Sequence, residues 1–324
     1  MDFGIRIVSA EKDKIVGERR RRHARGVSDS DPTRVAQKMI LDRRLHAVRD
    51  DLADERMRSK VDAPRYAEGR PARIAIGLAP VLHMPQPEAP LDTFYHYGEA
   101  VRVFDESDGY AWCQSRRDSY VGYVEAAALT YGDPPAPTHY VGGLGAYRYA
   151  EADLRSAIVD FLPRHSPVAV AQTGFECRGT AYVWLDGGGF LPAGCLSAKP
   201  PQSPDLAAAA SLYLGCPYLW AGRSFLGFDC SGLVQEAFRD LGMSVPRDTD
   251  MQRDAIGRAP EIANVADLRR NDLIFVPGHV MICAGEESVL HAYGGDMTVR
   301  RDRLADLVQA NRWNVADFTV RRLA

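Results

Sequence analysis

One cysteine has the type and position for nucleophilic chemistry. Cys230 stands between Asp229 and Ser231, at the expected first turn of a helix. A thiol there lies at the positive end of the helix dipole, which favours the thiolate that attacks carbonyl carbons. A lone cysteine on an apolar helix face is also a common inert core residue. The thiol by itself therefore leaves both interpretations open.

Two histidines favour the first interpretation. His279 enters one expected strand and His291 lies on the next, with Gly285 in the short segment between them. A hairpin centred on Gly285 would place the two histidines directly opposite each other, with Cβ atoms roughly 5 Å apart. Such a pair suits a base oriented by a second polar group, as in a Cys/His/His triad. The alternative is that both are satisfied surface or core histidines.

The elements that must position these residues form an α+β pattern after residue 205. Apolar residues at 230, 233, 234, 237, 238 and 241 share one face, which predicts a helix over Cys230–Leu241, and Gly242 is its expected C-cap. The other expected elements are a helix over 206–214, strands over 273–283 and 289–293, a helix over 304–309 and a strand over 318–320.

The residues before 205 are β-rich from about residue 73, with Pro-rich linkers at 132–137 and 199–204. Residues 122–129 match residues 189–196 at an offset of 67, the difference between 189 and 122. Two small β-barrels in tandem explain this match, and chance similarity of two strand-turn patterns is the alternative. The ending G-[YF]-[VL]-x-A-x-x-L resembles the last strands of bacterial SH3-like domains.

The expected architecture is a multidomain chain. The fold class is two small SH3-like β-barrels followed by an α+β domain. The N-terminal part is Arg-rich and reads as a tail that is partly helical or irregular, with Val35, Met39, Leu45, Val48 and Leu52 on one possible helix. The expected ranges are 1–72 for the tail, 73–132 and 138–198 for the barrels, and 205–324 for the α+β domain.

Composition narrows the function classes. The 324 residues are 46% hydrophobic and 26% charged with a formal net charge of −3, which is ordinary for a globular protein and gives no nucleic-acid footprint. Six cysteines without a C-x-x-C pair argue against a disulfide scaffold and a structural zinc site. No signal sequence or membrane span is predicted. We expect a cytoplasmic protein, or a periplasmic or exported one if the N-terminus was processed.

Residues 206–324 resemble the NlpC family of bacterial cell-wall cysteine peptidases, a branch of the papain-like superfamily. The resemblance rests on ordered blocks: GCPYLWAG at 215–222, GFDCSGL at 227–233, PRDTDMQ at 246–252, NDLIF at 271–275 and GHV at 278–280, followed by His291. Asn271 and Ala221 replace glycines usual in the family, and both changes should affect turns rather than chemistry. Tandem SH3-like domains before the peptidase domain are also known in this family.

The resemblance implies hydrolysis of the bond between γ-D-glutamate and diaminopimelate or lysine in murein stem peptides. It implies that Cys230 is the nucleophile, His279 the general base and acid, and His291 the residue that orients His279. Backbone N–H groups near Cys230, with Tyr218, would stabilise the oxyanion. No metal or organic cofactor is implied.

The resemblance also implies a pocket for the acyl side of the substrate. A free N-terminal L-alanine would bind there, and the first SH3-like barrel would close the pocket with Tyr120. The ammonium needs an acid, for which Glu99 is the candidate and Asp118 the reserve; alternatively Tyr120 packs in its barrel and Glu99 is a solvated loop charge. Arg247 either binds a substrate carboxylate or forms a structural ion pair. The family positions that line the pocket correspond to Tyr218, Trp220, Asp229, Ser231, Asp248 and Thr249.

The expected partner is therefore a murein stem peptide or muropeptide, with no nucleic acid and no membrane span. Two further functions stay open: a wall-peptide binding protein with an inactive peptidase domain, and an acyl or amide transferase on the same scaffold. The sequence leaves the oligomeric state, and the choice between lysine and diaminopimelate, undecided. The residues expected to serve packing alone are Cys113, Cys177, Cys195, Cys216, Cys283, Met281 and Phe238.

Overall fold

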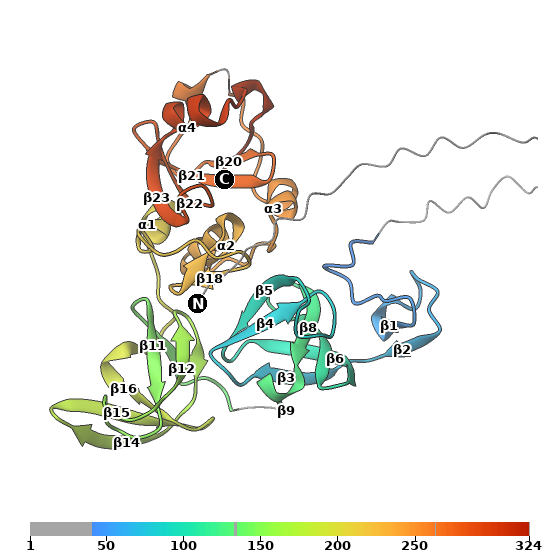
Figure 1. Ribbon diagram of the computed structural model, residues 1–324, viewed down its shortest axis with the longest axis vertical. Helices are drawn as coiled ribbons and strands as arrows, with labels where there is room; N and C mark the ends of the chain where they lie inside the picture. The colour runs from blue at the N-terminus through green and yellow to red at the C-terminus, as the bar shows by residue number, and fades with distance from the viewer. Residues whose placement is uncertain (1–40, 133–134, 263, 324) are drawn as a thin grey trace, which may run out of the picture. The chain divides into compact units, whose positions relative to one another are not determined.

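The computed structural model describes residues 41–132, 135–262 and 264–323 (Figure 1). Residues 1–40, which hold most of the expected tail together with Val35 and Met39, lie outside the described residues. The described elements belong to one compact unit that begins at Leu41. None of the described helices is long and apolar enough to cross a membrane.

The first β-rich body is a seven-stranded antiparallel sheet in the order β5-β4-β8-β7-β6-β3-β9. Its interior consists of alternate apolar residues from facing strands, among them Ile74, Val81, Tyr95, Val101 and Val124. The strands are β3 (Arg70–Ile74), β4 (Leu78–Leu82), β5 (Leu91–His96), β6 (Ala100–Ser107), β7 (Tyr110–Ser115), β8 (Val121–Glu125) and β9 (Leu129–Tyr131), with the 3-10 turn η2 (Ala126–Ala128).

The second β-rich body repeats the ending of the first. The turn η3 (Ala193–Cys195) follows η2 at the predicted offset, and the residues before the two turns share one conformation, with φ/ψ of −58°/130° at Glu125 and −59°/126° at Pro192. Its strands are β10 (His139–Val141), β11 (Gly145–Tyr149), β12 (Ile158–Pro163), β13 (Pro167–Val168), β14 (Val170–Cys177), β15 (Thr180–Leu185), β16 (Phe190–Pro192) and β17 (Leu196–Ser197).

The residues before β3 do not form the helix considered over Leu45, Val48 and Leu52. Leu45 lies in a turn, and Leu52 starts β1 (Leu52–Asp54), which pairs in parallel with β2 (Arg65–Ala67); η1 (Glu55–Met57) lies between them. The reason is tertiary packing: Ala47 and Leu52 are buried against apolar residues of the first barrel, a contact that overrides a weak helical period.

The C-terminal part is a five-stranded antiparallel sheet in the order β23-β22-β21-β20-β24, covered by helices on two faces. In β21, Val280 and Ile282 pack in the cluster that contains α2, whereas Met281 and Cys283 pack in the one that contains α4. Figure 1 shows this part in orange to red, with α4 and α2 on opposite sides of the sheet. The elements are α1 (Leu206–Ser211), β18 (Arg223–Ser224), β19 (Gly227–Phe228), α2 (Cys230–Asp240), α3 (Thr249–Ala255), η4 (Val265–Asp267), β20 (Leu273–Val276), β21 (His279–Gly285), β22 (Ser288–Tyr293), β23 (Thr298–Arg303), α4 (Leu304–Asn311), η5 (Val315–Asp317) and β24 (Thr319–Arg321).

The predicted helix at Cys230 is confirmed, because α2 begins at Cys230 and Gly242 follows it with a φ of 71°. The strand expected over residues 273–283 is instead a hairpin, β20 and β21, because Pro277 and Gly278 turn the chain. Gly278 has a φ of 74°, a conformation that glycine adopts without strain. The expected domain boundaries stay predictions.

A buried carboxylate joins the second barrel to α2. Asp240, the last residue of α2, accepts hydrogen bonds from Arg164 and Ser203 and contacts His165 Nε2 at 2.5 Å. Burial would raise the pKa of Asp240, but its partners outweigh it and hold that pKa well below its usual range. The ionised carboxylate is therefore a structural part of this contact.

Replacing Asp240 should destabilise the protein. In Asp240→Ala the buried Arg164 guanidinium loses its counter-charge, and the cost should be about 3 kcal/mol. We expect the urea unfolding transition to move to a lower urea concentration. Asp254→Ala, which removes an exposed partner of Arg253, is the matched control and should leave the transition in place. Equal transitions for wild type and Asp240→Ala would contradict this role.

Candidate active site

Asp229 determines where the candidate nucleophile lies. It is the N-cap of α2, and its Oδ1 accepts from the Gly232 N–H at 2.7 Å. Its Oδ2 accepts from the Ala221 N–H at 2.9 Å and from Arg247 Nη2 at 2.6 Å. Cys230 is thereby fixed as the first residue of the helix, next to a loop and an ion pair that hold its backbone in place.

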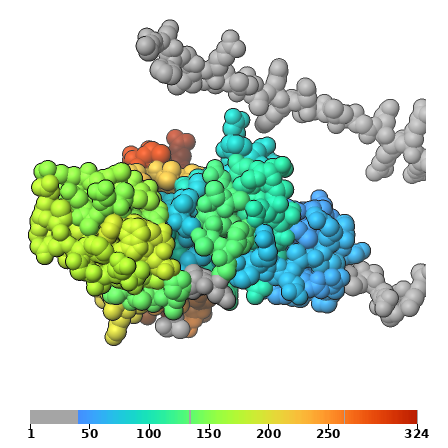
Figure 2. All heavy atoms as spheres, turned by 90° about the horizontal axis from the view of Figure 1, so that it is seen from below, coloured from blue at the N-terminus to red at the C-terminus, as the bar shows by residue number. Residues whose placement is uncertain are grey.

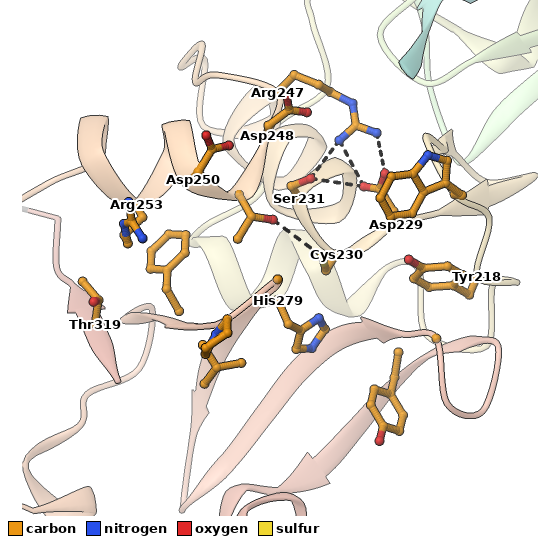
Figure 3. Close-up of a pocket in the computed structure, with 18 of the residues that line it drawn as sticks. Tyr218, Asp229, Cys230, Ser231, Arg247, Asp248, Asp250, Arg253, His279 and Thr319 are labelled. Carbon is orange, nitrogen blue, oxygen red and sulfur yellow. Dashed lines mark hydrogen bonds and ion pairs between the residues drawn. The ribbon is translucent and has the colours of Figure 1, made fainter. Parts of the chain in front are cut away.

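Arg247 forms the structural ion pair that was one of its two expected roles. Arg247 is 1% exposed and donates to Asp229, to Ser231 Oγ at 2.8 Å and to Thr93 Oγ1 at 2.8 Å (Figure 3). Its guanidinium therefore makes four hydrogen bonds with three side chains of the protein, Asp229, Ser231 and Thr93. Asp229 and Ser231, expected to line the acyl pocket, also belong to this buried network, although all three residues border the cavity.

The two histidines meet, but in a register that differs from the predicted one. β21 and β22 pair Ile282 with Leu290 and Cys283 with Val289, whose register continues to His279 opposite Tyr293 rather than opposite His291. The hairpin turns at Glu286 and Glu287, both with positive φ, instead of at Gly285. The shift of two positions keeps both histidines on one face because side-chain direction alternates with period two.

The imidazoles are joined by a hydrogen bond. His279 Nε2 lies 2.8 Å from His291 Nδ1, and His291 Nε2 lies 2.9 Å from Asp302 Oδ2. The ring of His291 stacks on Tyr293, with 5.1 Å between centroids. His291 is 1% exposed and lies behind His279, outside the lining of the cavity. Asp302 was missed by the sequence analysis, because only the pairing of β22 with β23 brings it to His291.

This chain of contacts determines the tautomers of both rings. The carboxylate of Asp302 only accepts, so His291 carries its proton on Nε2 and accepts at Nδ1. His279 must then donate from Nε2, which leaves the Nδ1 lone pair for the thiol. Burial, followed by the neighbouring His291, lowers the pKa of His279 to about 3, and burial also lowers the pKa of His291 against the opposing effect of Asp302. Both rings are neutral at neutral pH.

Cys230 and His279 border the same cavity (Figure 3). Burial, and next the charge of Asp229, raises the pKa of Cys230, while the Val280 backbone N–H and the Thr249 hydroxyl oppose the rise. The Thr249 oxygen is 3.8 Å from the sulfur. The raised pKa of the thiol and the lowered pKa of the imidazole favour the neutral form of both groups in the substrate-free site.

These residues open onto a cavity of about 850 Å³. The size suits a short peptide rather than a single small ion. Among the residues expected from the sequence, Tyr120, Tyr218, Trp220, Asp248 and Thr249 border it together with Cys230 and His279. Those that sequence reasoning missed are Arg44, His83, Asp92, Asp250, Arg253, Tyr293, Trp313, Asp317 and Thr319.

Glu99 and Asp118 do not border the cavity, which corrects the expected assignment of the ammonium-binding acid. Glu99 is buried and paired with Arg117 and Arg223, each at 3.0 Å. Asp118 accepts from Gln235 Nε2 at 2.8 Å. Both carboxylates point towards α2, and the sequence pattern gave no indication of this direction.

Two other carboxylates, Asp92 and Asp248, border the cavity. Asp248 Oδ2 accepts from the Tyr120 hydroxyl at 3.1 Å, which brings Tyr120 to the cavity as expected. Asp92, on β5, contacts His83 at 3.2 Å. Burial raises the pKa of both aspartates. Half-buried carboxylates of this kind favour a cation at the site. Asp92 had no sequence signal beyond its place in an expected barrel.

The described residues hold no group of three or more His, Cys, Asp or Glu side chains arranged to bind a metal ion.

Comparisons with known proteins agree with this architecture. A family model described as the NlpC/P60 family matches residues 215–321, and one described as a bacterial dipeptidyl-peptidase SH3 domain matches residues 81–129. The chain thus carries an NlpC/P60 domain preceded by a bacterial SH3 domain. The expected fold class, SH3-like β-barrels followed by a papain-like α+β domain, is confirmed.

Individual relatives have related names. The chain is 31% identical over 107 residues to a γ-D-glutamyl-L-lysine dipeptidyl-peptidase of Bacillus cereus, covering 31% of each chain. It is 36% identical over 191 residues to the peptidoglycan endopeptidase RipB of Mycobacterium tuberculosis, covering 57% of this chain and 64% of RipB. The match spans about a third of the length of the first relatives, 31% and 34%. The crystal structure of an NlpC/P60 family protein from Bacillus cereus superposes with a TM-score of 0.63 at 20% identity, covering 78% of this chain and 99% of that one, a likeness of fold.

Asp302 should act on His291 through its charge. In Asp302→Asn the carboxylate that favours the protonated ring is gone, so the pKa of His291 should fall further. Nitrogen NMR of the imidazoles across a pH titration measures this pKa and the tautomer together. Asp306→Asn, an exposed change on α4, should leave the His291 signals unchanged. An unchanged His291 titration in Asp302→Asn would argue against this effect of the Asp302 charge on His291.

Alkylation of Cys230 should report its raised pKa. In the substrate-free protein the iodoacetamide rate should still be rising at about pH 9, because a free thiol titrates near 8.5 and burial moves this one higher. The Cys230→Ser variant gives the background from the other five cysteines. A rate that reaches its plateau below about pH 7 would mean that a thiolate–imidazolium pair exists at rest.

Proposed function

We propose that this protein is a cysteine endopeptidase that hydrolyses the bond between γ-D-glutamate and a diamino acid in murein stem peptides. The observation that carries the proposal is the pair of hydrogen bonds that joins Asp302 to His291 and His291 to His279, together with the cavity that His279 shares with Cys230, Asp92 and Asp248. The names of the matched relatives, and the family of the matched domain, support a peptidase of the cell wall.

The chemistry follows from the tautomers. The Cys230 sulfur attacks the γ-carbonyl carbon of the glutamyl residue while its proton passes to His279 Nδ1. Backbone N–H groups at the start of α2 face the developing oxyanion, with Tyr218 beside them. His279 returns the proton to the leaving amine, which departs as the diamino acid. Water then attacks the thioester and gives one proton to His279, which passes it to the departing sulfur and so restores the thiol. The acid that is released loses the remaining water proton to solvent and leaves as the carboxylate.

We propose that two carboxylates bind the amino-terminal end of the substrate. Asp92 and Asp248 border the same cavity as Cys230, and Tyr120 is hydrogen-bonded to Asp248. We assign Asp92 and Asp248 to the ammonium of an N-terminal L-alanine, in place of Glu99, because both border the cavity and burial raises the pKa of both, so that a nearby cation would stabilise their ionised forms. A substrate with a free amine is a small wall fragment, so we place this activity in cell-wall recycling in the cytoplasm.

The direct test uses L-Ala–γ-D-Glu–diaminopimelate and its lysine analogue with wild type and Cys230→Ala. Wild type should release the free diamino acid, measured by mass spectrometry, and the comparison of the two peptides decides which diamino acid is preferred. Cys230→Ala and His279→Ala should each lower kcat on the order of 10⁴-fold or more, since the thiol and its base act as one unit. Release that persists in Cys230→Ala would refute Cys230 as the nucleophile.

Two alternatives are separated in the same assay. A wall-peptide binding protein would bind the peptide without release by wild type. A transferase would form L-Ala–γ-D-Glu amides when an amine is added, at the expense of the free acid. We expect the free acid to dominate at all amine concentrations, and acetylation of the alanine amine to abolish turnover.

A further inference from the structure

A segment before the barrels contributes a cation to the cavity. The family models begin at residue 81, so residues 41–67 lie outside both matched regions. Arg44 nevertheless borders the cavity together with Cys230 and His279. Arg44 is not among the residues that the family resemblance assigned to the site.

The backbone of this segment is fixed on the first barrel. The Arg44 carbonyl accepts from the Val121 N–H at 2.8 Å, and the Leu45 carbonyl accepts from Gln114 Nε2 at 2.8 Å. Arg49 donates to Asp105 at 2.6 Å. Figure 2 shows the segment, in blue, packed against the barrel. The backbone at Arg44 is therefore fixed on the first barrel.

The side chain of Arg44 is held at its other end by three carboxylates. Nη1 donates to Asp248 Oδ2 at 2.9 Å and to Asp250 Oδ1 at 3.0 Å, and Nη2 donates to Asp250 Oδ2 at 2.7 Å. Asp42 of the same segment accepts from Nη2 at 2.8 Å and from the Arg44 backbone N–H at 2.9 Å. The pairing with Asp42 orients the Arg44 guanidinium towards Asp248 and Asp250.

The contact with Asp248 has a consequence for the cavity. Asp248 is the N-cap residue of α3, yet its carboxylate makes no capping bond. Its Oδ2 instead accepts from both Tyr120 and Arg44, and its Oδ1 makes no hydrogen bond with a described residue. Asp92 makes no hydrogen bond with an arginine among the described residues; its Oδ2 contacts His83, and Arg247 and Arg44 act on its pKa only through their charge. The cavity thus keeps two acceptors for a cation beside a fixed guanidinium.

We propose that Arg44 is a specificity-determining residue that closes the acyl-side end of the cavity. It holds Asp248 with Oδ1 directed to the substrate ammonium, and its guanidinium occupies the space that a residue or sugar attached to the alanine nitrogen would need. The inference deepens the proposed function and rests on it. A peptide with a free amine fits between Arg44, Asp92 and Asp248, whereas a blocked amine meets the guanidinium and leaves the aspartates without a counter-charge.

The experiment compares wild type, Arg44→Ala, Arg44→Lys and the control Arg43→Ala on the free and N-acetylated forms of L-Ala–γ-D-Glu–diaminopimelate. Arg43 is exposed and pairs only with the exposed Asp50 in the described structure, so its variant should match wild type. Arg44→Ala should raise KM for the free peptide at least about tenfold and reduce the preference for it over the acetylated one by at least about tenfold, as expected for lost charged hydrogen bonds. The KM and the preference of Arg44→Lys should lie between those of wild type and Arg44→Ala, because a lysine ammonium cannot bridge two carboxylates as a guanidinium does.

Two results would overturn the assignment. Faster turnover of the free peptide by Arg44→Ala would mean that the Arg44 guanidinium competes with the substrate ammonium for the aspartates and inhibits the enzyme. An unchanged KM and an unchanged preference would mean that the contact is structural only. Equal thermal unfolding of the Arg43 and Arg44 variants establishes that the folds are comparable.

A binding measurement separates this inference from the proposed function. Calorimetry of L-Ala–γ-D-Glu and its N-acetyl form, on Cys230→Ala with and without Arg44→Ala, needs no turnover. Preferential binding of the free dipeptide that weakens at least about tenfold without Arg44 supports the assignment even if wild type hydrolyses nothing. The absence of any preference for the free amine would overturn it.

Discussion

The Asp229 carboxylate is the interaction on which the rest of the site depends. It caps α2, binds the backbone of Ala221 and pairs with the buried Arg247, so one side chain fixes the helix, the preceding loop and the segment before α3. Cys230 has its position because its neighbour is held in this way. Without that cap, a partly buried thiol at the start of a helix would have no fixed relation to His279 on the neighbouring sheet.

A second set of buried charges joins the first barrel to α2, so that both parts contribute residues to the cavity. Arg223 and Arg117 bridge Glu99 of the first barrel to Glu236 of α2. Arg117 and Glu99 come from the barrel, so the pairs hold it against the helix that carries Cys230. Buried ion pairs of this kind contribute orientation rather than large net stability. They keep Tyr120 and Asp92 at the edge of a site whose reactive groups come from the C-terminal part.

Several features could be predicted from the sequence because they depend on local spacing. The helix at Cys230 followed from apolar residues on one face, and the repeated barrel ending followed from two matching segments. The meeting of His279 and His291 was predicted, but through a turn at Gly285 that the chain does not make. The prediction of proximity survived because a shift of two positions preserves the face of a strand.

The sequence by itself determined which residues carry the proposed chemistry, since cysteine, histidine and helix-start patterns are local. Only the tertiary structure decided which charges surround them. Glu99 and Asp118 were reasonable acids by position, yet the folded chain turns both to α2, while Asp92, Asp302 and Arg44 reach the site from strands and a segment far along the chain. Long-range strand pairing and buried ion pairs set these contacts, and neither has a period that a single sequence displays.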